Sequence, residues 1–175
     1  VGNLIIVQYE TSIPLAQGKL VLAPWWVDYQ GGSAQFAKRD TQYDHQSLRF
    51  SGAYETGLWR YGVDAGYTLD APELISGNKQ NQSLAIQVNY GKLKKQGDYQ
   101  AHLRFFKTER FGVISEFAQN ATAGFATANI KGFDTRVRYK ISRSVWVGVR
   151  YSQLDTITGT VESSHRFRIE TAATF

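Results

Sequence analysis

The sequence of 175 residues contains no cysteine and no methionine, and it has three prolines. The absence of cysteine excludes a disulfide framework, thiol catalysis and cysteine-ligated metals, and it is compatible with an oxidising compartment such as the periplasm. No run of apolar residues approaches the roughly 20 that a transmembrane helix needs, and the mean hydropathy is −0.35. A helical membrane protein is therefore excluded.

Histidine is also scarce, with three residues in the whole chain. His45, His102 and His165 are not within metal-ligand spacing of one another, so we expect no metal site and no cofactor. Ser163 and Ser164 precede His165 at the head of a predicted strand, but adjacent strand residues point to opposite faces and a nucleophile needs a bonded base with an orienting third group. We expect a polar rim there and no enzyme activity.

Residues 131–175 show strict alternation of apolar and polar side chains. In residues 133–141 the odd positions hold Phe, Thr, Val, Tyr and Ile, and the even positions hold Asp, Arg, Arg and Lys. Residues 145–152 and 165–175 repeat this period of two, which indicates strands with one apolar face.

A soluble sheet of this kind would bury its apolar face against a second layer, but no segment has a helical periodicity long enough to supply one. A sheet closed on itself satisfies the pattern when its apolar face meets lipid and its polar face lines a watery lumen. We therefore predict an all-β fold, an antiparallel up-and-down transmembrane β-barrel that forms one domain over residues 1–175. The competing class is a soluble lipocalin-type barrel, with apolar residues inside.

The alternation predicts about nine strands in all. The expected strands are 3–11, 19–29, 47–55, 58–69, 83–90, 99–106, 133–141, 145–152 and 165–175. Short turns near Gln17, Thr56, Lys95 and Ser142 alternate with longer connections at 31–45, 70–82, 108–132 and 153–163. This alternation is typical of outer-membrane barrels, which have short periplasmic turns and long extracellular loops.

Pro24 complicates the second predicted strand, residues 19–29. Proline lacks the N–H that a strand ladder needs, so we expect a bulge at this position. The phase of the strand turns Trp25 and Tyr29 outward and Asp28 inward.

Aromatic residues are abundant, with ten tyrosines, ten phenylalanines and four tryptophans. Several follow the outward phase of the predicted strands, where aromatic rings gather at the membrane interface. We expect an interfacial belt rather than a sugar-binding track. The predicted belt residues are Trp25, Trp59, Tyr67, Tyr90, Tyr99, Tyr139 and Tyr151.

The formal net charge is +5 and the isoelectric point is about 9.4. Nucleic-acid binding does not follow, because lysine and arginine alternate with apolar residues along strands instead of forming one patch, and none of the nucleic-acid-binding motifs is present. The plainer interpretation is a cationic lumen.

Residues 91–100, Gly-Lys-Leu-Lys-Lys-Gln-Gly-Asp-Tyr-Gln, resemble the Gly-Lys-Leu-Lys-Lys-x-Gly-Asp-Trp segment of the bacterial putative porin family, with Tyr99 where that family often has Trp. Residues 129–133 and the turn at 141–144 resemble the family's C-terminal end. The likeness covers about residues 45–175 and implies a porin-like protein of the Gram-negative outer membrane. The family has no catalytic residues to transfer, and its members are longer than this chain.

The polar phase of the predicted strands forms the lumen surface. Both signs of charge occur there, and cross-strand pairing neutralises some of them, but cations exceed anions towards the C-terminus. The predicted pore-lining residues are Arg49, Arg60, Asp64, His102, Arg104, Asp134, Arg136, Arg138, Lys140, Arg150, Arg166, Arg168 and Glu170. In a water-filled pore this excess would favour anionic solutes.

We therefore expect an outer-membrane porin for passive diffusion of small hydrophilic, preferably anionic, solutes. The alternative is a closed barrel that acts as a structural anchor and binds a partner through its long extracellular loops.

The terminal Phe175, preceded by apolar residues at alternating positions, resembles the C-terminal signal that outer-membrane barrels present to their assembly machinery. That machinery and outer-membrane lipid are the expected partners. Bacterial single-chain barrels have an even strand number, whereas about nine strands would place the first and last strands parallel. We expect residues 1–175 to be the C-terminal part of a larger barrel, completed by N-terminal strands or by another chain.

Overall fold

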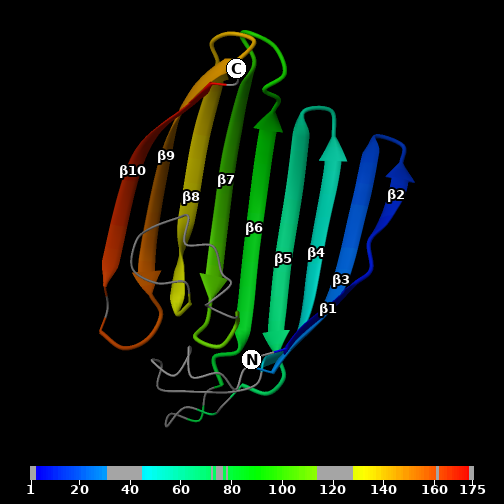
Figure 1. The fold of residues 1–175 in the computed structure, drawn as a ribbon, viewed down its shortest axis with the longest axis vertical. Coiled ribbons are helices and arrows are strands. Elements are labelled where there is room, and N and C mark those ends of the chain that lie inside the picture. Colours follow the sequence, from blue (N-terminus) through cyan, green and yellow to red (C-terminus); the bar gives the residue numbers. More distant parts are fainter. Residues whose placement is uncertain are drawn as a thin grey trace.

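The computed structural model describes residues 3–30, 45–71, 73, 77, 79–113, 128–160 and 162–173. These residues form one antiparallel sheet of ten strands in the order β1-β3-β4-β5-β6-β7-β8-β9-β10, with β2 also paired to β3 (Figure 1). From β3 to β10, strands that follow one another in the chain are neighbours in the sheet, and β1 and β2 both pair with β3. The predicted all-β, up-and-down topology is therefore confirmed.

The strands are β1 (Asn3–Gln8), β2 (Thr11–Leu15), β3 (Gly18–Gln30), β4 (His45–Thr56), β5 (Trp59–Thr68), β6 (Gln82–Gly91), β7 (Tyr99–Thr108), β8 (Ile130–Lys140), β9 (Val145–Thr156) and β10 (Ser163–Ala173). Among the described residues there is no helix long and apolar enough to cross a membrane.

The connections differ in length at the two ends of the sheet. Residues 16–17, 57–58, 92–98 and 141–144 join strands at one end, which is at the top of Figure 1 and is called the turn end. The connections that follow β3, β5, β7 and β9 lie at the opposite end, called the loop end. β1 starts at the loop end and β10 finishes at the turn end, so the two edge strands run in the same direction.

Cross-strand register assigns each residue to one of two faces. Val137 of β8 lies opposite Val149 of β9, which lies opposite Ile169 of β10, and these residues belong to the outer face. The alternate residues form the inner face. In β10 the outer-face Phe167 and Ile169 are 66% and 76% exposed, whereas the inner-face residues of this strand are partly shielded.

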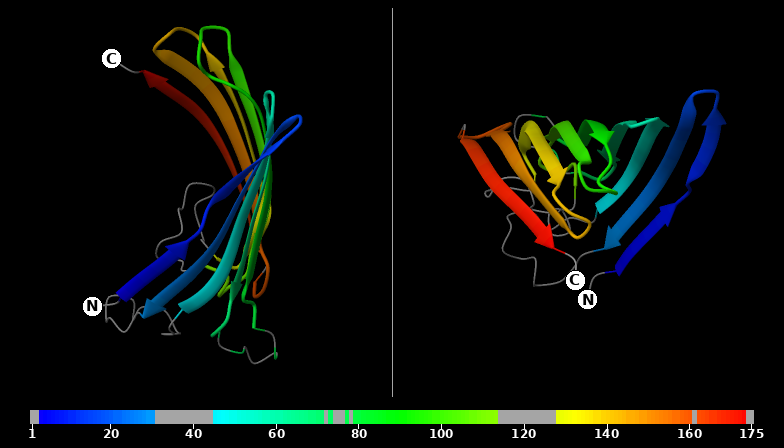
Figure 2. Two further views of the ribbon diagram at one scale, coloured as in Figure 1. Left: turned by 90° about the vertical axis from the view of Figure 1, so that its right-hand side faces the viewer. Right: turned by 90° about the horizontal axis from the view of Figure 1, so that it is seen from above.

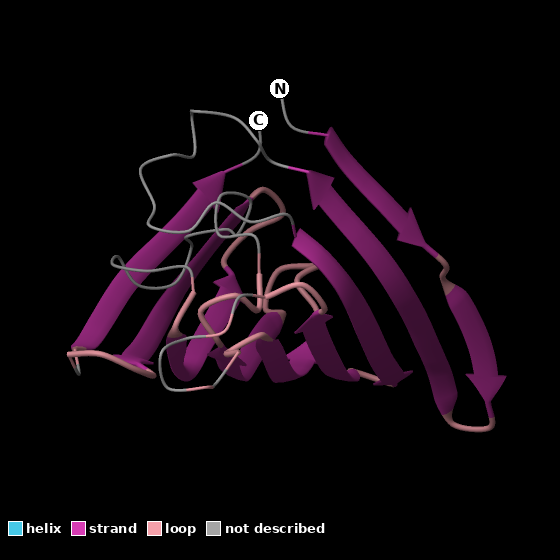
Figure 3. Cartoon of the chain, turned by 90° about the horizontal axis from the view of Figure 1, so that it is seen from below, coloured by secondary structure: helices cyan, strands magenta, loops and turns pink. Residues whose placement is uncertain are grey.

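The sheet is strongly bent, and its inner face is the concave one (Figures 2 and 3). Arg49 and Thr68, both on the inner face, donate hydrogen bonds to the carbonyl oxygens of Gly112 and Phe111, whose segment lies on the concave side. The convex outer face exposes large apolar side chains on every described strand except β3, and a soluble monomer rarely exposes an apolar surface of this extent. This arrangement is the reverse of a lipocalin-type barrel.

The predicted bulge at Pro24 is wrong. β2 pairs Leu22 with Thr11 and β1 pairs Trp25 with Gln8, so one unbroken register runs past the proline. Pro24 instead interrupts the hydrogen-bond ladder, because its carbonyl oxygen accepts a bond but its nitrogen carries no hydrogen to donate.

Tyr9 lies opposite the proline, and its N–H donates to the Pro24 carbonyl at 3.1 Å. The missing return bond coincides with the gap between β1 and β2. The first predicted strand, residues 3–11, is therefore two strands in one register, and the second of them continues through Pro14 to Leu15.

The predicted orientation of residues 19–29 is also wrong. β4 pairs Trp25 with Arg49 and Tyr29 with His45, which places both aromatic residues on the inner face. Asp28, predicted to face the lumen, lies on the outer face for the same reason. Both phases of β3 are apolar, so its alternation alone carries no information about which phase faces inward.

The small apolar core lies on the inner face near the loop end. It consists of Ile130 and Leu154, 4% and 0% exposed, with Phe106 packed against them. β1 with β2 at one side of the sheet, and β10 at the other, each have a neighbour on one side only. The described sheet is therefore bent but open.

Candidate functional site

A row of charged residues crosses the inner face of the sheet in register. Arg136 on β8 lies directly opposite Arg150 on β9, which lies directly opposite Arg168 on β10. On the other side of Arg136, the row continues to His102 on β7 and Asn89 on β6. Directly opposed like charges destabilise a sheet, so this row is not what a sheet selected for stability alone would carry.

Asp134 offsets part of this charge at the centre of β8. Its carboxylate is 2% exposed and accepts a hydrogen bond from Arg150 Nε at 2.7 Å. Asp134 Oδ1 also lies 3.8 Å from His102 Nε2, and His102 Nδ1 lies 2.7 Å from Asn89 Oδ1. The four side chains form a mostly shielded network that ties β6, β7, β8 and β9 together.

Glu170 of β10 is the second acidic residue of this region. Its two carboxylate oxygens lie 3.7 Å from Arg138 Nη2 and 3.8 Å from Arg168 Nη1. The Arg138 guanidinium also lies 4.4 Å above the Trp146 ring, and Arg104 lies 5.0 Å above the Phe106 ring. Planar guanidinium groups stack well on aromatic rings, so these arginines are held in place although they exceed the acids.

The imbalance of charge follows from the register of the last four strands. Within the described parts of β7 to β10, two acids, Asp134 and Glu170, share the inner face with seven permanent cations. The seven are Arg104, Arg136, Arg138, Lys140, Arg150, Arg166 and Arg168.

The earlier strands carry fewer charges on the same face. Glu55 of β4 lies 3.3 Å from Arg60 and 3.6 Å from Lys19, at the turn end. Ser51 donates a hydrogen bond to Asp64 at 2.6 Å. These pairs lie on exposed side chains and leave the inner face close to neutral in this part of the sheet.

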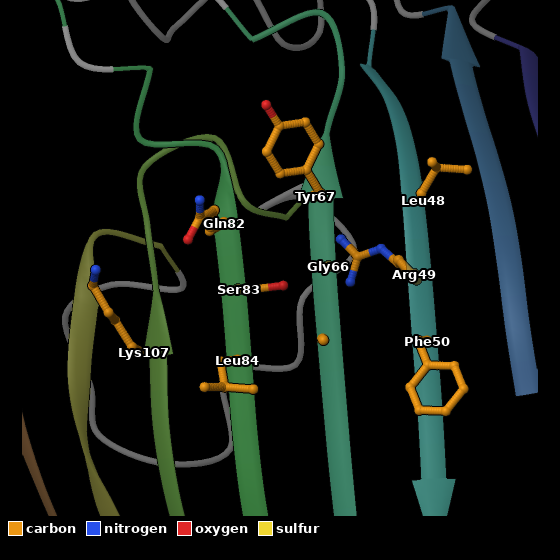
Figure 4. Close-up of a pocket in the computed structure, with 10 residues that line it drawn as sticks. Leu48, Arg49, Phe50, Gly66, Tyr67, Gln82, Ser83, Leu84 and Lys107 are labelled. Carbon is orange, nitrogen blue, oxygen red and sulfur yellow. The ribbon is translucent and has the colours of Figure 1, made fainter. Parts of the chain in front are cut away.

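A loop segment covers the inner face at the loop end of β4, β5 and β6. Phe111 is 2% exposed, its N–H donates to the Gln80 carbonyl at 2.9 Å, and its own carbonyl accepts the Thr68 hydroxyl at 2.6 Å. Arg49 crosses Gly66 of β5 to reach the Gly112 carbonyl at 3.1 Å (Figure 4). The described start of the long connection after β7 therefore folds back onto the inner face of β4, β5 and β6 and covers part of it.

A groove of about 550 Å³ lies beside Arg49 and Gly66 (Figure 4). Its walls include the outer-face residues Leu48, Phe50, Tyr67 and Leu84, with Lys107 at one side. Most of the groove belongs to the apolar outer surface, so it is separate from the charged row.

All thirteen predicted pore-lining residues lie on the inner face by register, from Arg49 on β4 to Glu170 on β10. The structure brings His102, Asp134 and Arg150 into one network, whereas Arg60 and Asp64 lie apart from it. Sequence reasoning did not single out Asn89 or Phe111. Asn89 could have been predicted, because it lies in the inward-facing phase of its strand. No pattern in the sequence around Phe111 predicts that this residue is buried.

The six predicted belt residues other than Trp25 lie on the outer face. Ser163 and His165 lie there too, but the Ser163 hydroxyl donates to Asp155 at 2.6 Å and the Tyr151 hydroxyl lies 2.9 Å from His165 Nδ1. The serine and the histidine therefore bond to different partners. Within the described part of the chain, no three His, Asp or Glu side chains are grouped as a metal site.

The profile of the putative porin family matches residues 34–175. The chain belongs to this family. No curated protein and no solved structure matches the sequence. As a member of the putative porin family, the chain is a porin-like protein of the outer membrane, which accounts for a sheet that is apolar on its convex side and charged on its concave side. Phe175, the predicted assembly signal, lies outside the described residues.

Proposed function

We propose that this sheet is part of the wall of a water-filled channel in the Gram-negative outer membrane, through which small hydrophilic solutes, preferably anions, diffuse passively. The observation that carries the proposal is the row Arg136, Arg150 and Arg168, where like charges are opposed across three strands. Such a row lowers stability and raises the local concentration of anions in a water-filled pore. No catalytic step belongs to this function.

A channel wall also needs closure, because an unpaired backbone group in lipid costs several kcal/mol. We propose that further strands, from the same polypeptide or from another chain, pair with β1 and β2 on one side and with β10 on the other. Since the two edges run in the same direction, an antiparallel closure requires an odd number of added strands, and the barrel then has the even number typical of bacterial outer membranes.

Planar-bilayer recording of the intact protein tests the channel. We expect an ohmic current whose anion-to-cation permeability ratio falls by a factor of about 10 when Arg136, Arg138 and Arg168 are changed to serine. The matched control changes Lys79, Lys107 and Lys131 to glutamine, which removes the same charge at the loop end and leaves the inner face of the sheet intact. A protein that inserts but passes no current would refute the channel and favour the closed anchor.

The closure is tested separately with paired cysteines, since the chain has none of its own. Ile5→Cys and Ile169→Cys place one thiol on each edge, and we expect no disulfide between them under oxidation. An efficient intramolecular disulfide would show that β1 and β10 meet directly, and that no strands lie between them.

A further inference from the structure

The turn between β6 and β7 has a composition that the channel does not explain. Lys92, Lys94 and Lys95 are all exposed there, in the same Gly-Lys-Leu-Lys-Lys segment that resembles the family motif. A cavity of about 430 Å³ opens beside the turn, and its walls include these three lysines and one acid, Asp98, together with Leu58, Tyr90 and Tyr99. The turn lies beyond the strands at the turn end, away from the arginine row.

The turn is held in one conformation before any ligand binds. The backbone N–H groups of Lys95 and Lys94 donate to the Asp98 carboxylate at 3.0 and 2.9 Å, which holds the pKa of Asp98 below its ordinary value. Gly97 N–H donates to the Lys140 carbonyl at 2.9 Å, and Lys140 N–H donates to the Asp98 carbonyl at 2.8 Å. These bonds tie the turn to the end of β8, so little ordering is needed when a ligand binds.

One wall of the cavity continues into a group of aromatic rings on the outer face. The Trp59 and Tyr90 rings lie 4.6 Å apart between centroids, and the Tyr90 and Tyr99 rings lie 5.7 Å apart. Tryptophan and tyrosine favour the depth at which hydrocarbon meets the lipid headgroups. On a membrane-embedded sheet, the lysines of this turn would therefore lie at headgroup depth.

We propose that this cavity binds the phosphate headgroup of an anionic phospholipid in the leaflet at the turn end. The lysine ammonium groups contact the phosphate, and the glycerol with the first acyl carbons lies against Leu58, Tyr90 and Tyr99. The proposal rests on the membrane location in the proposed function. The aromatic wall commits the site to a lipid, because the rings place the lysines at headgroup depth and give the glycerol and acyl carbons an apolar surface that a soluble anion or an acidic protein would not use.

Removal of each lysine should weaken the interaction about fivefold, so a variant without all three should bind roughly 100-fold more weakly. The experiment uses the intact polypeptide purified from membranes. Native mass spectrometry during titration with phosphatidylglycerol or phosphatidylcholine measures both affinities. We expect the wild type to prefer phosphatidylglycerol and the variant Lys92→Gln, Lys94→Gln, Lys95→Gln to lose that preference while it keeps wild-type conductance.

The matched control is again Lys79→Gln, Lys107→Gln, Lys131→Gln, which removes the same charge at the opposite end and should keep the preference for phosphatidylglycerol. Equal loss in both variants, or equal affinity of the wild type for the two lipids, would overturn the site. Loss of binding to purified peptidoglycan in the turn variant, with unchanged phosphatidylglycerol binding, would overturn it in favour of the cell wall.

If the triple variant does not assemble, the affinities of the wild type and of single lysine variants for the two lipids still test the lipid site. Conductance recorded on the same preparations separates the two proposals. A wild-type protein that prefers phosphatidylglycerol but passes no current would support the lipid site and refute the channel.

Discussion

The inner face of the sheet differs between its two sides. On β3 it carries Val27 and Tyr29, which are 6% and 8% exposed, together with Trp25. On β8 to β10 the same face carries the row Arg136, Arg150 and Arg168. The outer face, in contrast, is apolar on both sides of the sheet.

The difference shows which requirements the membrane imposes and which it leaves open. Lipid demands an apolar outer face and a fully paired backbone, and it constrains every strand in the same way. The inner face does not touch lipid, so its residues can vary along the sheet. The fold therefore does not require the concentration of arginine on one side, which is the feature that the proposed channel function would explain.

The largest effect is expected when charged residues are introduced on the apolar outer face of β8 and β9, so that both faces of these strands carry arginine. Val137→Arg with Val149→Arg places two charges on the outer face, each at a cost of about 2–4 kcal/mol if it lies near the middle of the bilayer. The folded fraction in isolated outer membranes, measured by heat-modifiable migration, should fall to near zero. The control Arg136→Ser with Arg138→Ser alters the inner face of β8 and should assemble normally. Poor assembly of the control alone would reverse the assignment of the faces.

Loss of the buried acid in the charged region should have the next largest effect. Asp134→Asn leaves Arg150 without its charged partner, which should lower the free energy of unfolding by about 3 kcal/mol. Urea unfolding in lipid bilayers measures this. Asp64→Asn, which loses one exposed hydrogen bond to Ser51, is the matched control and should cost no more than about 1 kcal/mol. Equal losses would mean that the network around Asp134 adds nothing.

The apolar side of the inner face can be located with single cysteines. Trp25→Cys should react with a water-soluble thiol reagent about tenfold faster than Trp26→Cys, since a thiol that faces lipid meets little of the reagent. Labelling rates in proteoliposomes provide the measurement. Faster reaction at position 26 would contradict the pairing of Trp25 with Arg49 and restore the predicted orientation, in which Trp25 faces outward.

The smallest effect is expected at the turn end, away from both regions. The pKa of Asp98 is lowered by the N–H groups of Lys95 and Lys94, so the ionised carboxylate stabilises the fold. That contribution is complete above the ordinary pKa of an aspartate and is lost as the pH falls through the lower folded value. The protection of the backbone amides at residues 94–97, taken at each pH as the intrinsic exchange rate divided by the observed rate, should therefore fall in acid for the wild type. In Asp98→Ala this protection should already be low at neutral pH, and identical protection profiles in the two proteins would refute the role of the carboxylate.

Most of the fold could be predicted from alternation because β4 to β10 each have one apolar phase and one polar phase. For that reason all thirteen predicted lining residues are found on one face. β3 is apolar in both phases, and its orientation followed only from the pairing of Trp25 with Arg49. Proline at position 24 was correctly recognised as a ladder defect, but whether the chain bulges or simply omits a bond depends on the neighbouring strand.

The sequence by itself determined the strand order, the short and long connections and the identity of the charged residues, because alternation and turn composition are local properties of the chain. Only the tertiary structure decided that three arginines are opposed across β8, β9 and β10, that Asp134 bonds to Arg150, and that residues 109–113 fold onto the inner face. Those relations depend on the register between strands and on the bend of the sheet. Both are fixed jointly by many cross-strand contacts, and no single segment of the chain specifies them.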